Sequence, residues 1–171
     1  MAIYTNITRC GAFEAPHETP MSRAFFKMLQ AQTNFIVAER DLDDVGHSQD
    51  PAYDKWLHEA ECAQEHLTTC LGEICALTPG LAEDRPLLRM AVLIDTMLGN
   101  GEPGGARRLL REMQAAFFSK YQTRGLGPSA MHRNALLLHC LHLTSAMIAL
   151  PLFDGDEITD LESDQDLPPV C

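Results

Sequence analysis

Between Asp50 and Leu77, apolar residues recur at alternating spacings of three and four residues. This period is that of one face of an α-helix, and it is kept for more than three heptads. Asp50 and Pro51 are typical of a helix start, and Thr78-Pro79-Gly80 is typical of a stop. Because so narrow a stripe needs partner helices to cover it, the pattern predicts a helical bundle. The stripe comprises Tyr53, Trp56, Ala60, Ala63, Leu67, Cys70, Ile74 and Leu77.

The same helical period predicts four further helices, each bounded by proline, glycine or capping residues. We expect Thr19, Asp84 and Ser129 to cap three of them, because their side chains can accept hydrogen bonds from free amides of a first turn. The predicted ranges are about 20–41, 86–98, 106–122 and 129–150.

Two features within these helices bear on packing. Gln32 and Thr33 interrupt the apolar stripe of the first helix. Such a polar pair can be a buried hydrogen-bond site, part of a pocket wall or the flank of the stripe, and we favour the flank. The helix over 129–150 is apolar on nearly all sides, which is typical of a helix in the middle of a bundle or at a subunit interface. The sequence therefore predicts an all-α fold: an N-terminal arm (1–18), a bundle of about five helices (19–153) and an acidic tail (154–171) that is disordered when alone.

Charge and composition narrow the function classes. The net charge is −11, which argues against non-specific binding of the whole molecule to nucleic acid or to an anionic membrane. Seven of the acids lie between Asp154 and Asp166, so the remainder carries −4 (−11 + 7). The most apolar window, Ala135 to Phe153, is interrupted by His139, His142 and Pro151, which favours a bundle helix over a membrane span. With no readable secretory segment over 1–20 and no Cys-x-x-Cys pair among six cysteines, we expect a cytoplasmic protein without a disulfide framework.

Histidines and cysteines raise the possibility of a metal site. Cys62 and His66 are four residues apart, and His139 and His142 are three apart, so each pair could face one ion. However, the Glu-x-x-His repeats of di-iron bundles are missing. We therefore expect no metal and no cofactor.

Catalytic alternatives are weaker still. Thr144 and Ser145 lie near His142, but nothing resembles a strained nucleophile turn. A phosphate-accepting histidine would need an accessible ring beside a cation, and of His58, His66 and His132 only His132 has one in sequence, Arg133. We expect these histidines to be solvated, and the protein to be non-enzymatic.

Arg107, Arg108 and Arg111 form the one concentrated positive patch, and between Pro103 and Arg133 six basic residues face the single acid Glu112. Such a patch can be a plain solvated face, a docking site for the acidic tail or another protein, or a nucleic-acid face. We name these three arginines as candidate partner-binding residues.

The interpretation that follows is a regulatory protein that acts through protein-protein contacts as a homodimer, since the long stripe and the apolar last helix offer more apolar surface than five helices readily hide. The alternative is a bundle that senses a small molecule or a metal between the 50–77 helix and the last helix, as a transcriptional regulator would.

Overall fold

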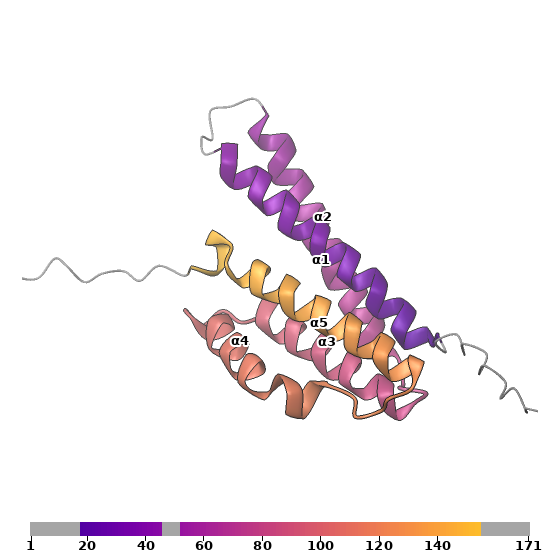
Figure 1. Ribbon diagram of the computed structural model, residues 1–171. Coiled ribbons are helices and arrows are strands. Elements are labelled where there is room, and N and C mark those ends of the chain that lie inside the picture. Colours follow the sequence, from indigo (N-terminus) through magenta and orange to yellow (C-terminus); the bar gives the residue numbers. More distant parts are fainter. Residues whose placement is uncertain (1–17, 46–51, 155–171) are drawn as a thin grey trace, which may run out of the picture.

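The computed structural model describes residues 18–45 and 52–154, and in these residues it contains five α-helices and no strand (Figure 1). The predicted all-α bundle is thus confirmed for this part of the chain. Apart from residues 18 and 154, the predicted arm (1–18) and tail (154–171) lie outside the described residues, as do Asp50 and Pro51. The helix that these two residues were predicted to start begins at Tyr53, with Ala52 as its N-cap. The helices are α1 (Pro20–Val45), α2 (Tyr53–Ala76), α3 (Arg85–Leu98), α4 (Gly105–Ala116) and α5 (Pro128–Ile148), with short helical turns η1 (Ala82–Asp84), η2 (Phe117–Tyr121) and η3 (Pro151–Phe153).

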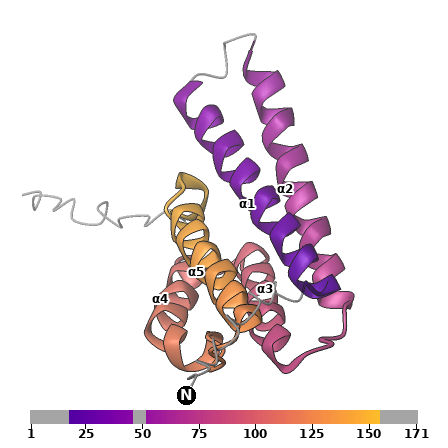
Figure 2. The same cartoon turned by 45° about the vertical axis from the view of Figure 1, so that its right-hand side comes forward.

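The two longest helices, α1 and α2, form an antiparallel hairpin, and α3, α4 and α5 pack beside one end of it (Figures 1 and 2). The α2 stripe is covered as predicted, since Leu67, Cys70 and Ile74 are buried. Both helices of the hairpin hold the two parts together, because α1 packs on α3 and α5 and α2 packs on α3. Phe25 of α1, at 0% exposure, belongs to the continuous core. Burying one such side chain contributes about 1.5–3 kcal/mol.

Two polar predictions in the helices need correction. Gln32 does not lie on the flank of the α1 stripe: it is fully buried, and its Nε2 donates a hydrogen bond to Thr144 Oγ1 of α5 over 3.2 Å. Thr33 is exposed, as a flank position requires. Ser129 does not cap α5, because the helix begins one residue earlier and Gly127 is its N-cap. Thr19 does cap α1, since its Oγ1 accepts from the Ser22 amide over 3.1 Å.

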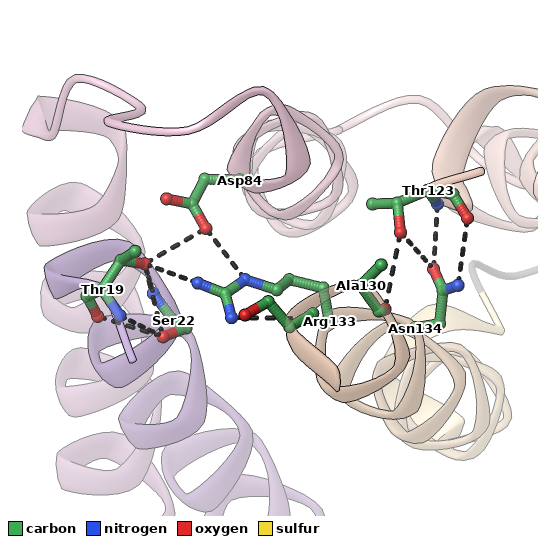
Figure 3. A network of polar contacts seen from close by, with 8 residues as sticks. Thr19, Ser22, Asp84, Thr123, Ala130, Arg133 and Asn134 are labelled. Carbon is green, nitrogen blue, oxygen red and sulfur yellow. Dashed lines mark hydrogen bonds and ion pairs between the residues drawn. The ribbon is translucent and has the colours of Figure 1, made fainter. Parts of the chain in front are cut away.

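Asp84 and Arg133 form a buried ion pair that ties three segments together (Figure 3). The Asp84 side chain makes no capping bond to α3, against our expectation, and points inward. Its Oδ1 accepts from Arg133 Nε and from Thr19 Oγ1, both over 3.1 Å, and Arg133 Nη2 donates to Thr19 Oγ1 over 3.3 Å. The start of α1, the turn before α3 and the start of α5 are thereby held in one geometry.

The last helix, α5, packs against α1, α3 and α4, which agrees with a central position. It is not buried on all sides, however. Met131 is 65% exposed and Leu138 is 37% exposed, and Ala135, between them on the same face, is exposed as well. One apolar side of α5 therefore faces solvent in the single chain.

Candidate functional site

The basic helix α4 begins at a glycine pair. Gly104, its N-cap, has a φ of +69°, a left-handed conformation that suits glycine. A Cβ on Gly105 would lie 2.5 Å from Asn100 Nδ2, so a larger residue there would require the Asn100 side chain to shift. This tight entry lets α4 start directly after the connection over 99–104, and its three arginines are exposed within the first two turns.

The structure divides the predicted patch in two. Arg107 and Arg111 are four residues apart and share one face of α4, where both line a groove. Arg108 points elsewhere and pairs with Glu102, with 2.8 Å between Nη2 and Oε2. The hydrogen bond from Arg108, together with its charge, lowers the pKa of the Glu102 carboxyl. The charge of Arg108 is therefore neutralised by Glu102. Of the three arginines, Arg107 and Arg111 remain on the side of the groove.

The groove lies between α4 and the end of α5 and has a volume of about 900 Å³. We call it the α4–α5 groove; its walls include Arg107, Leu110, Arg111, Ile148 and Phe153. Arg107 forms an ion pair with Asp154, which also lines the groove. Arg111 is exposed and forms no ion pair within the part of the chain that the structure describes. The groove thus combines apolar walls with two guanidinium groups. That of Arg107 is paired with Asp154, and that of Arg111 has no ion-pair partner among the described residues.

Sequence reasoning identified the arginines but not the groove. Its opposite wall comes from α5 and η3, and no local pattern relates Ile148 or Phe153 to Arg107. The surface formed by residues 103–133 carries less positive charge than the count of six basic residues and one acid indicated, because Arg133 is buried. Lys120 and Arg124 are exposed but line another groove, of about 410 Å³, together with Arg89.

The predicted histidine and cysteine pairs are not brought together. Cys62, His66, His139 and His142 are exposed, and α1 packs on both α2 and α5. In residues 18–45 and 52–154, no three His, Cys, Asp or Glu side chains lie close enough to hold a metal ion.

The neighbours of the histidines also differ from the sequence prediction. His132 lacks the adjacent cation proposed for it, because the Arg133 guanidinium points into the core. His66 lies 3.9 Å from Cys70 Sγ through its Nε2 and lines a groove of about 630 Å³ together with Lys27 of α1. Nothing in the sequence indicated that His66 and Lys27 line the same groove, because they belong to different helices.

The thiols differ sharply in environment. Cys62 and Cys75 are exposed, whereas Cys70 and Cys140 are buried, and all four are free. Burial raises the pKa of the Cys140 thiol to about 12, although a contact with Thr144 acts in the opposite direction. Such a thiol is a packing residue and not a nucleophile at neutral pH.

None of the helices in the described residues combines the length and apolar content that crossing a bilayer requires. Comparison with known protein families, with curated proteins and with solved structures finds no match to the chain.

Proposed function

We propose that this chain is a non-enzymatic, cytoplasmic regulatory protein whose α4–α5 groove binds an acidic segment of a partner protein. The observation that carries the proposal is the Arg107–Asp154 pair, in which a carboxylate already lies against one of the two groove arginines. Arg111 stands one helical turn further along the same face and offers a second guanidinium. An acidic side chain at each position would satisfy both cations.

The apolar walls add to this charge pattern. Leu110 and Ile148 flank the arginines, so the groove combines apolar contact with charge. Arginine is enriched at protein interfaces because its planar guanidinium forms two parallel hydrogen bonds with a carboxylate. A segment that alternates acidic and apolar residues matches both features of the groove.

We further propose that the protein works as a homodimer through the exposed side of α5. Met131 and Leu138, seven residues apart on one face of the helix, supply apolar area there. Contiguous exposed apolar area is typical of association surfaces. Light scattering at micromolar concentration should give twice the chain mass of 19.0 kDa, and a monomeric mass would contradict the dimer.

The groove is tested by binding, with a matched control. The double variant Arg107→Glu/Arg111→Glu reverses two charges in the groove, whereas Arg23→Glu/Arg40→Glu reverses two exposed charges on α1. A partner captured by cross-linking to the native chain is then purified and titrated against all three proteins. We expect the groove variant to bind at least about tenfold more weakly and the α1 variant to bind like the native chain, since charge reversal at a paired site costs several kcal/mol. Equal affinity of the three proteins would overturn the proposal.

A further inference from the structure

We propose that the acidic C-terminal segment of this chain, residues 155–166, occupies the α4–α5 groove of its own molecule. A partner must then displace it, so the segment acts as an intramolecular competitor. This regulatory consequence rests on the proposed function, whereas the docking itself does not. The segment is identified by its charge and by the position at which the chain leaves the described residues.

The described chain ends at the groove. After α5 the chain turns through η3, and Phe153 and Asp154 both line the groove. Asp154 is the last described residue, and it is already paired with Arg107. The segment therefore begins directly after a residue that lines the same groove as Arg111, so it needs no long connection to reach that guanidinium.

The charge of the segment matches the groove. Residues 155–166 contain six acids and no lysine or arginine, while the groove presents Arg107 and Arg111. The acids are spread along the segment at positions 156, 157, 160, 162, 164 and 166, with Ile158 and Leu161 between them. These two apolar residues suit the Leu110 and Ile148 walls, so the segment has the mixed character that the groove requires.

Length and tethering favour the same occupant. Twelve extended residues span about 40 Å, whereas the 12 residues of α4 rise about 18 Å, so the segment is long enough to follow the helix. A tethered segment has an effective local concentration in the millimolar range, which an untethered acidic peptide seldom reaches. Exposed ion pairs that are weak one at a time therefore suffice to hold it.

The docking is tested in the full chain by paramagnetic relaxation. A nitroxide is attached at Ser163→Cys after Cys10, Cys62, Cys75 and Cys171 are changed to serine; the buried Cys70 and Cys140 are kept. We expect the amides of Arg107 and Arg111 to relax at least about threefold faster than that of Thr69 on α2 in 50 mM salt, and the difference to vanish in 1 M salt, where the Debye length is about 3 Å. Circular dichroism confirms that each variant is folded.

Charge reversal makes the test specific. Arg107→Glu/Arg111→Glu should abolish the enhancement, Arg23→Glu/Arg40→Glu should leave it unchanged, and adding Asp156→Lys/Glu157→Lys/Asp160→Lys to the groove variant should restore it. Uniform relaxation across the protein, relaxation concentrated at Arg89, Lys120 and Arg124, or an enhancement insensitive to groove reversal would each overturn the proposal. Because no partner is present, docking without partner binding would refute the proposed function alone.

Discussion

The substitution Arg133→Met should destabilise the protein by about 3–5 kcal/mol, the usual cost of removing one member of a buried ion pair. Both side chains of the Asp84–Arg133 pair are 0% exposed. Without the guanidinium, the Asp84 carboxylate would keep only the Thr19 hydroxyl as a hydrogen-bond donor among the described residues, because its Oδ2 already has none. Since a domain of this size is typically stable by about 5–15 kcal/mol, the loss is a large part of the total.

The magnitude is tested with a double-mutant cycle followed by urea unfolding. Asp84→Leu should be as costly as Arg133→Met, because it leaves a buried guanidinium without its carboxylate. The double variant should be much closer to the native chain than either single variant, since two apolar side chains replace the pair. The hydrogen bonds that the Thr19 hydroxyl and the Ser129 carbonyl receive from Arg133 are lost, at a cost of about 1 kcal/mol each. Arg85→Met, at an exposed arginine next to Asp84, serves as the matched control and should change stability by less than about 0.5 kcal/mol.

Two results would refute this reasoning. A loss below about 1 kcal/mol for Arg133→Met would mean that the pair is solvated and not buried. Strict additivity of the two single variants would mean that Asp84 and Arg133 do not interact.

Three further outcomes follow from the polar and sulfur groups of the core. Gln32→Met should change the free energy of unfolding by less than about 1 kcal/mol, because Oε1 has no partner among the described residues, whereas Gln32→Ala should cost about 2–4 kcal/mol through the cavity it leaves; urea titration compares them. In the native state an aromatic disulfide reagent should modify Cys62 and Cys75 within minutes and Cys140 only after unfolding, as intact mass shows. The pKa of the Cys140 thiol in the folded protein, about 12, lies above its ordinary value of 9.0. The contribution of this thiol to stability is therefore complete below pH 9 and is lost as the pH rises toward 12. Cys140→Ala should flatten the fall in the free energy of unfolding between about pH 9 and 10.5 by up to about 1.4 kcal/mol per pH unit.

The helices could be predicted from sequence because their signals are local. The apolar period and the positions of proline and glycine were enough to locate all five helices. Thr19 and Pro20 also predicted the first residue of α1 correctly. The end of α4 shows the limit of the period. After Ala116 the backbone widens into the π-helical turn η2, which buries Phe117 and leaves Phe118 exposed, and a constant 3.6-residue repeat does not anticipate this change.

Buried polar residues could not be predicted because their partners are distant in sequence. Gln32 meets Thr144, and Asp84 meets both Thr19 and Arg133, only after the helices have packed. Charged residues are mostly exposed, so the default assignment puts Asp84 at a cap and Arg133 on the surface. The candidate site shows the same limit: the three arginines are visible in sequence, but whether they share one groove depends on the direction of each side chain and on the end of α5.

If Arg107 and Arg111 recognise acidic segments in the α4–α5 groove, the chain should bind an acidic peptide in solution. Fluorescence anisotropy of a labelled peptide with the sequence of residues 154–168 measures this binding. The receptor is the full chain with its own acids at 156, 157, 160, 162, 164 and 166 changed to the corresponding amides. We expect saturable binding that weakens with salt, disappears in Arg107→Glu/Arg111→Glu and persists in Arg23→Glu/Arg40→Glu. Equal binding to both variants, or no binding to any of the three proteins, would contradict the recognition of acidic segments by Arg107 and Arg111.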